Sequence, residues 1–170
     1  NGSIENPLTV TNVTFDIDDL TANFAINEYK VVFEAKDNGI IEGEIEQYVK
    51  HEENSKEVIA VPNEGYHFVK WSNDFTDSSL IIENVTEDKT VEAYFEIDTF
   101  KIEFASDENG SIEGETFQEI EYGNNAQAVT AVSIDGYHFE KWTSDKRPNL
   151  NGFKYNTLTV TNITNDIDDI

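Results

Sequence analysis

Cysteine is absent from the sequence, which excludes disulfide scaffolds, thiolate zinc sites and cysteine nucleophiles. The cellular compartment stays open on this ground, because an exported protein can also do without disulfides. Methionine is absent as well, and we therefore expect a mature form or an excerpt of a longer chain. Long hydrophobic runs are also missing, and none approaches the length of a membrane-spanning segment.

Basic residues are scarce, since 11 Lys and Arg stand against 35 Asp and Glu and give a formal net charge of −24. Binding to nucleic acid or to an anionic bilayer needs Lys and Arg, so we expect no nucleic-acid partner and no membrane insertion. The same charge permits cation binding and favours solubility. Hydrophobic residues make up 38% of the chain and aromatic residues 12%, too many for a disordered acidic tail.

The sequence repeats itself with an offset of 71 residues. Gly65-Tyr66-His67-Phe68 recurs as Gly136-Tyr137-His138-Phe139, and Trp71 recurs as Trp142. Over the 43 positions from 29 to 71, 19 residues are identical in the second copy. Such an internal repeat predicts two copies of one structural unit.

A third, partial copy opens the chain, since residues 1–20 match residues 151–170 at 13 of 20 positions. We therefore expect three segments along the chain. Residues 1–25 form the end of a preceding repeat, with its closing strand at 20–24. Residues 26–97 form a complete repeat, and residues 98–170 form a second one with a loop insertion near 143–156 and without a closing strand of its own.

Apolar residues within each copy recur with a period of two. Tyr29, Val31 and Phe33 follow this pattern, which predicts a half-buried strand. Asn38-Gly39 then predicts the tight turn of a hairpin into Ile41.

In the later Gly-Tyr-His-Phe-x-Lys-Trp block, strict alternation places Phe68 and Trp71 on opposite faces of a strand. A 3.6-residue apolar period never persists for three turns. The predicted fold class is therefore mainly β, with little or no helix.

The order of the blocks Asn-Gly-x-Ile, Gly-Tyr-His-Phe-x-Lys-Trp and Asn-(Val/Ile)-Thr resembles the internalin-type B repeats, in particular their divergent Listeria–Bacteroides class. The resemblance covers nearly the whole chain. It implies tandem β-grasp-like repeats on secreted or wall-attached surface proteins, where they act as spacers or weak adhesive units. The family carries no catalytic residues, so the resemblance implies neither an enzyme nor a cofactor.

Two acidic clusters are the best metal candidates in the sequence. Ca²⁺ takes six to eight oxygen ligands, which clustered carboxylates and turn carbonyls can supply. The spacing of an EF-hand is missing, however, and a solvated acidic turn is the alternative that we favour. The candidate calcium ligands are Asp16, Asp18, Asp19, Asp166, Asp168 and Asp169.

Three Asn-(Val/Ile)-Thr sequons recur at equivalent repeat positions. Their asparagines, Asn12, Asn84 and Asn162, are either glycosylation sites or turn residues, and we favour the turn.

Aromatic residues and histidines allow further alternatives. Trp71 and Trp142 are either core anchors, which we favour, or exposed platforms for a glycan. His67 and His138 are either a metal or proton site or, as we favour, strand residues that cover a neighbouring Trp.

The split repeat leads to the sharpest hypothesis. In the repeat alignment the closing strand bears Leu20, Ala22 and Phe24 on its apolar face. The β-grasp arrangement implied by the resemblance places a closing strand beside the first strand of its repeat. In the second repeat that first strand bears Phe100, Ile102 and Phe104, and without a closing strand it would expose backbone groups and an apolar groove.

Two assemblies follow from this hypothesis. Residues 1–24 of another copy would fill the groove by strand addition, and such a head-to-tail contact builds filaments unless it closes into a ring. Alternatively, adjacent repeats of one longer covalent chain fill it. Our first choice of function is a structural segment of an extracellular fibre, stalk or adhesin. The alternative is a module that binds a glycan or host protein, with Phe153 and Tyr155 as its aromatic candidates.

Overall fold

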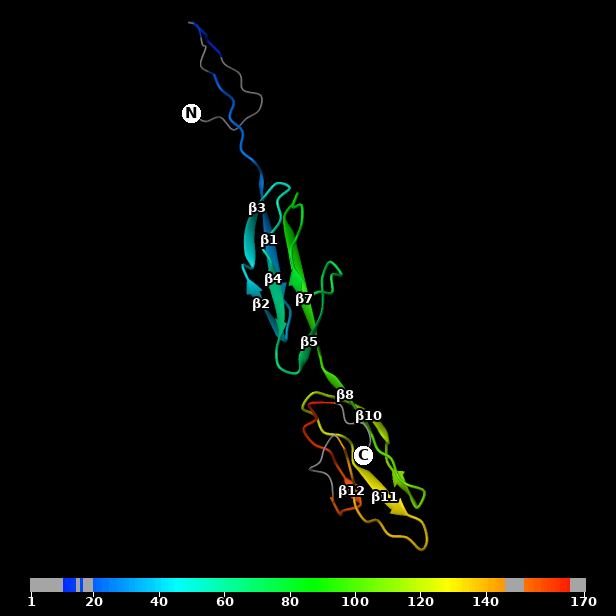
Figure 1. Ribbon diagram of the computed structural model, residues 1–170. Helices are drawn as coiled ribbons and strands as arrows, with labels where there is room; N and C mark the ends of the chain where they lie inside the picture. The colour runs from blue at the N-terminus through cyan, green and yellow to red at the C-terminus, as the bar shows by residue number, and fades with distance from the viewer. Residues whose placement is uncertain (1–10, 15, 17–19, 146–151, 166–170) are drawn as a thin grey trace.

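The computed structural model describes residues 11–14, 16, 20–145 and 152–165. These residues form strands and loops without any helix, which confirms the mainly β fold class. In the same residues there is accordingly no helix long and apolar enough to cross a membrane. Figure 1 shows two units arranged end to end, with residues 20–27 leading into the first unit at its far end from the second.

The first unit comprises seven strands in two sheets. The larger sheet has the order β3-β1-β7-β5 and the smaller one the order β2-β4-β6. Strands β1 and β7 pair in parallel at the centre of the larger sheet, and the other pairs are antiparallel. The strands are β1 (Glu28–Ala35), β2 (Gly39–Gly43), β3 (Glu46–Lys50), β4 (Val58–Pro62), β5 (Tyr66–Trp71), β6 (Ser79–Leu80) and β7 (Lys89–Ile97).

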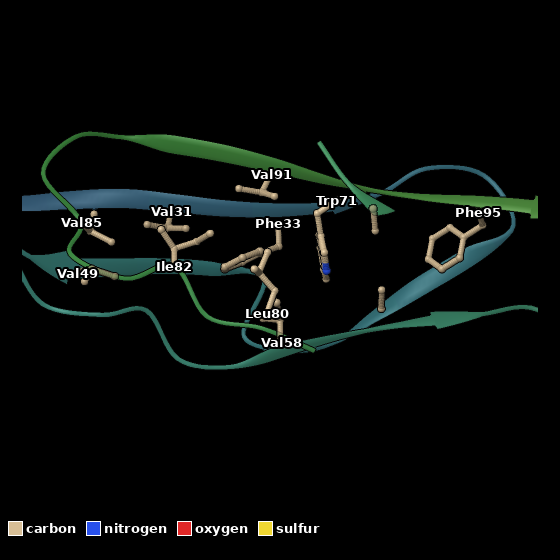
Figure 2. Packing of buried hydrophobic residues seen from close by; sticks show 12 residues of the cluster. Val31, Phe33, Val49, Val58, Trp71, Leu80, Ile82, Val85, Val91 and Phe95 are labelled. Atoms are coloured by element: carbon tan, nitrogen blue, oxygen red, sulfur yellow. The ribbon is translucent and has the colours of Figure 1, made fainter. Parts of the chain in front are cut away.

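The core of the first unit lies between these two sheets, because the period-two pattern turns alternate side chains of each strand inward. Trp71 is fully buried at its centre, with the ring of Phe33 packed edge-on at a centroid distance of 6.1 Å. Figure 2 shows the core side chains in a row from Val85 at one end to Phe95 at the other.

Two local predictions were wrong, and the first concerns the hairpin. Asn38 does form a turn, with a φ of 75°. The strand that follows it, β2, pairs with β4 and not with β1. The Asn-Gly turn therefore carries the chain from one sheet to the other, which closes the core instead of extending a sheet.

The second wrong prediction concerns the faces of β5. The pairing of β5 with β7 shifts by one residue between Phe68 and Lys70, which marks a β-bulge. As a result, Phe68 packs against the core beside the buried Trp71, with ring centroids 5.7 Å apart. The bulge inverts the alternation, which no period-two count can anticipate.

The second unit repeats this plan with fewer strand pairs. Strand β8 pairs with β10, and β9, β11 and β12 form a three-stranded sheet. A second core lies between these sheets, centred on Trp142 and Phe104. The strands are β8 (Thr99–Glu103), β9 (Gly110–Glu113), β10 (Phe117–Glu121), β11 (Val129–Ser133) and β12 (Thr157–Leu158).

The difference between the units lies at the closing strand. In the first unit β7 gives β1 and β5 a common neighbour. Within the described part of the second unit no strand holds that place, so β8 has one strand neighbour where β1 has two. Residues 137–141, the counterpart of most of β5, consequently form no strand although their sequence is nearly the same. The β-grasp detail of the fold stays a prediction.

Candidate assembly surfaces

The closing strand of the first unit, β7, is held on both sides. Val91, Ala93 and Phe95 turn inward and are buried in the core. Beyond the ladder with β1, the amide of Lys36 donates to the carbonyl of Ala93 at 2.9 Å, and the amide of Ser72 donates to the carbonyl of Glu92 at 2.8 Å. This strand therefore joins the two halves of the larger sheet.

The outer face of β7 carries a small charged ladder. The ammonium of Lys36 and the hydroxyl of Tyr94 both donate to the carboxylate of Glu92, at 2.5 and 2.7 Å. The Lys36 hydrogen bond is the largest cause that holds the pKa of Glu92 below its ordinary value, while the pKa of Lys36 is raised. Both side chains are partly exposed, so this ion pair contributes little to stability.

The predicted acceptor residues lie on β8 and at its end, as the repeat required, but they do not expose an apolar groove. Ile102 and Phe104 are buried in the second core and Phe100 is half-buried against it. Their inward faces are already covered by Trp142 and by the sheet of β9, β11 and β12. The prediction was wrong about their exposure, because side chains of the second core cover them.

A cavity of about 470 Å³ lies instead next to these residues. Its walls come from the chain that follows β8, from the ends of β9 and β11, and from the irregular segment 137–143. Among its lining residues are Gly110, Tyr137, Phe139 and Trp142. In the first unit the equivalent space, beside Gly39 and Phe68, holds the ring of Phe95.

The predicted donor residues are exposed. Leu20, Ala22 and Phe24 belong to a segment, residues 20–27, that forms no strand and contacts neither core. The side chain of Phe24 is 95% exposed. At the end of this segment the carbonyl of Asn27 accepts a hydrogen bond from the amide of His51 at 2.9 Å, so Asn27 contacts its own chain.

The junction between the units is a second contact surface, which the sequence analysis missed. Only Asp98 separates β7 from β8. Its amide donates to the carbonyl of Gly65 at 2.9 Å, and its carbonyl accepts from the amide of Tyr122 at 2.8 Å. The Tyr122 hydroxyl then donates to Glu64 at 2.7 Å, and His67 Nδ1 lies 2.8 Å from the Asp98 carboxylate.

These contacts tie the second unit to the end of the first. A single residue, Asp98, links β7 to β8, and side-chain hydrogen bonds surround it. The two units are therefore held in one orientation. The only signal in the sequence is that Tyr122 replaces His51 at an otherwise equivalent position. A single substitution of this kind does not predict a contact with another unit.

A buried glutamine in each unit was also missed. Gln118 donates from Nε2 to the carbonyls of Glu115 and Gln127, at 2.9 and 3.1 Å, and accepts from the Gln127 amide at 2.7 Å. Gln47 makes the same three bonds in the first unit. Each glutamine satisfies the backbone where one strand ends and a loop crosses it.

Most of the predicted metal ligands, namely Asp18, Asp19, Asp166, Asp168 and Asp169, lie outside the described residues. Asp16 is exposed. Among the residues with a described position, no group of three or more His, Cys, Asp or Glu side chains is placed to hold a metal ion.

The sequon asparagines are exposed, and Asn84 and Asn162 lie at bends of the chain. Asn12, Asn84 and Asn162 have φ values of 56°, 50° and 52°, a left-handed conformation that asparagine tolerates better than most residues. The following residues Val85 and Ile163 are fully buried. These observations agree with the favoured structural role of the asparagines.

The tryptophan and histidine positions that recur in both repeats differ in their exposure. Trp71 and Trp142 are 0% and 4% exposed, which confirms that they are core anchors. Each indole Nε1 donates to a backbone carbonyl, of Asp77 and Tyr155 respectively. His67 instead faces solvent at the junction and bonds to Asp98.

Two copies of one all-β unit, joined through a single residue, define a tandem-repeat protein. The sequence model of the divergent InlB B-repeat domain matches residues 29–99 and 100–166. The chain therefore belongs to this family, a repeat domain of surface proteins and not a class of enzymes. Neither a curated protein nor a solved structure matches the chain.

Proposed function

We propose that this chain is a structural segment of an extracellular fibre, stalk or adhesin, in which rigidly joined repeats hold a shape and extend reach. The junction around Asp98 supports this function most directly. A flexible linker would let the two units move independently. Here backbone hydrogen bonds of Asp98, the hydrogen bond from Tyr122 to Glu64 and the packing of the Tyr122 ring on Gly65 fix the second unit on the first. A rod of this kind needs neither a catalytic site nor a cofactor.

The proposed rod extends beyond one chain by strand exchange. The segment 20–24 of one copy inserts into the second unit of another, in the place that β7 holds in the first unit. The contact is head-to-tail, because donor and acceptor are different surfaces, and repeated contacts of this kind generate a filament unless they close into a ring.

The test is the solution mass of the 170-residue chain, measured by light scattering as a function of concentration, together with electron microscopy. The intact chain is expected to form oligomers or filaments, and a variant without residues 1–24 is expected to be monomeric. If both stay monomeric at all concentrations, exchange between copies is overturned, and the rod consists of covalently linked repeats alone.

A second candidate function is recognition of a glycan or a host protein through the loop insertion of the second unit. Phe153 and Tyr155 pack with ring centroids 5.5 Å apart, and Tyr155 is 74% exposed. Exposed aromatic pairs beside polar groups are typical of recognition surfaces. Loss of binding in a glycan or host-extract screen on Tyr155→Ala, with Phe75→Ala as the exposed aromatic control, tests this function.

A further inference from the structure

An open groove of about 920 Å³ lies on one side of the first unit, in which the structure describes every residue from 20 to 97. The groove lies between the edges of the two sheets. Strand β6, the edge strand of the smaller sheet, lines it together with the residues that follow, and the beginning of β7 lines it from the larger sheet. The loop after β5 also contributes to its lining. The groove is thus present in a unit whose strands are all in place.

The beginning of β7 presents an open sheet edge to this groove. The amide of Ser72 donates to the carbonyl of Glu92, so the backbone groups of Glu92 point toward the side of β5. Thr90 lies two residues earlier, and its N–H and C=O therefore point to the same side. Strand β5, however, ends at Trp71, which stands opposite Ala93. Thr90 is exposed and has no residue of β5 beside it, so an extended segment can add to β7 there.

Apolar side chains stand beside this open edge. Phe75 and Ile81 both line the groove, and their side chains are 46% and 45% exposed. Three buried members of the core, labelled in Figure 2, line it as well: Leu80, Ile82 and Val91. A large apolar side chain placed between Phe75 and Ile81 would be removed from water on both sides, which favours its binding.

The other copies of the repeat show what is particular to this groove. Residues 80–84 read Leu-Ile-Ile-Glu-Asn, whereas residues 158–162 and 8–12 both read Leu-Thr-Val-Thr-Asn. Ile81 and Glu83 thus stand where the other copies have threonine, and these positions are exposed in both units. Neither residue belongs to the core. The fold therefore does not require this exchange, which adds apolar surface and negative charge to the groove of one repeat.

The charges favour a basic partner. Glu83 and Asp88 line the groove, and among its lining residues Lys89 alone is basic. The net charge of −24 adds a field of the same sign, which attracts a cationic segment and repels an acidic one. The segment that leads into the first unit does not supply the complement, because residues 1–27 contain neither Lys nor Arg.

We propose that this groove binds an extended, basic segment of a partner protein. The main chain of the segment adds to β7 beside Thr90, in the line of β5. One large apolar side chain lies between Phe75 and Ile81, and a Lys or Arg faces Glu83. This binding surface goes beyond the structural role proposed above, because it gives one repeat of the rod a partner that the other repeat does not take.

A library of random nine-residue peptides displayed on phage tests the groove with the full-length chain. Selection on the parent chain is followed by counter-selection on the double variant Ile81→Thr/Glu83→Thr. This variant carries the residues of the other repeats and is expected to fold normally. Enriched peptides are expected to contain several Lys or Arg residues and one large apolar residue. Enrichment of acidic or uncharged peptides, or of none that distinguishes the two chains, overturns the proposal.

The most enriched peptide, labelled with fluorescein, then gives dissociation constants by fluorescence polarisation. Ile81→Thr is expected to raise the Kd roughly 10-fold through lost apolar contact, and Glu83→Thr about 2- to 5-fold. Only the effect of Glu83→Thr is expected to shrink at high salt, because salt screens a charge pair. The matched control is Ile40→Ser, which replaces an exposed isoleucine outside the groove by its counterpart Ser111. An equal effect of this control overturns the assigned site.

Single N-methyl groups on the peptide test the strand addition without changing the protein. Successive residues of an added strand point their backbone groups to opposite sides. Methylation is therefore expected to abolish binding at every second position and to be tolerated between them. If all methylated peptides bind like the unmodified one, the main-chain contact with Thr90 is overturned.

Reciprocal variants separate this groove from the candidate surface at Tyr155. Phe75→Ala is expected to weaken binding of the groove peptide, whereas Tyr155→Ala is expected to leave it unchanged. The reverse result places the peptide at Tyr155 and overturns the groove. A second copy of the chain is the competing occupant. If the parent chain oligomerises and the double variant Ile81→Thr/Glu83→Thr does not, the occupant is a second copy and the basic partner is overturned.

Discussion

The ring of Tyr122 in the second unit lies directly on the Cα of Gly65 in the first. A Cβ built on Gly65 would lie 2.4 Å from Cδ1 of this ring. The φ of Gly65 is +79°, so the same glycine also provides a backbone conformation that other residues rarely adopt. One position thus serves both the turn before β5 and the contact between the units.

Gly65→Ala is therefore expected to disturb the junction as well as the turn. The matched control is Gly136→Ala, because Gly136 has a similar φ of +86° and nothing within 4 Å of a built Cβ. Both variants bear the strain of a left-handed alanine, about 1–2 kcal/mol. Only Gly65→Ala also displaces Tyr122, so denaturant unfolding is expected to show a larger loss of stability, and small-angle scattering a changed maximum dimension.

A double-mutant cycle with Tyr122→Ala checks the cause. If the excess cost of Gly65→Ala persists when the ring is absent, the ring contact does not explain it and the tight junction is contradicted.

The junction is also expected to respond to alkaline pH. The hydrogen bond to Glu64 is the largest cause that raises the pKa of Tyr122 above its ordinary value of 10.0. A group with a raised pKa in the folded state contributes its full stability below pH 10, and the contribution is lost as pH rises through the raised pKa. The difference in stability between the parent chain and Tyr122→Phe is therefore expected to be constant from about pH 7 to pH 9 and to shrink above pH 10.

Thermal unfolding at a series of pH values measures this difference. Tyr94→Phe serves as a comparison, since the hydrogen bond to Glu92 raises the pKa of Tyr94 in the same direction but away from the junction. Only Tyr122→Phe is expected to change the relative orientation of the units in scattering experiments. A stability difference that grows above pH 10 would contradict the assigned donor.

Gln118 offers a test of the buried backbone contacts. Gln118→Leu keeps a side chain of similar size but leaves two carbonyls and one amide without their partner. Each unsatisfied buried group costs roughly 1–3 kcal/mol, so we expect a loss of at least that size in denaturant unfolding. Gln127→Leu is the control, because the Gln127 side chain is exposed and only its backbone takes part in these bonds.

The repeat pattern predicted the strands and two copies of one unit, because these follow from a period of two and from internal identity. The place of the closing strand beside the first strand was predicted by the family resemblance, and in the first unit β7 does pair with β1. The repeat pattern did not predict which sheet β2 would join, since Asn38-Gly39 turns the chain equally well within a sheet or between two sheets. Nor did it predict the bulge between Phe68 and Lys70, which depends on the partner strand and not on local sequence.

The repeat pattern also did not predict the burial of the acceptor residues. Ile102 and Phe104 are covered by side chains from distant loops, and their burial depends on the whole core of the second unit. No sequence pattern predicts the contact of Tyr122 with Gly65, because it joins two units whose relative orientation is set by packing.

The two tryptophans provide a last test, because each unit contains one of them in its core. In Trp71→Phe the remaining indole reports the second unit, and in Trp142→Phe it reports the first. A synthetic peptide of residues 20–27 is expected to stabilise the second unit, in which β8 has a single described strand neighbour. At 100 times its dissociation constant the gain is about 2.7 kcal/mol.

The midpoint of unfolding followed by Trp142 is therefore expected to rise with peptide concentration, and the one followed by Trp71 is expected to stay nearly constant. A peptide with Phe24→Ala is expected to need a much higher concentration for the same shift. Because the peptide is uncharged along residues 20–26, its effect depends little on salt, whereas association of whole chains of charge −24 is expected to strengthen as salt screens their repulsion. Equal shifts in both fluorescence transitions would contradict a site confined to the second unit.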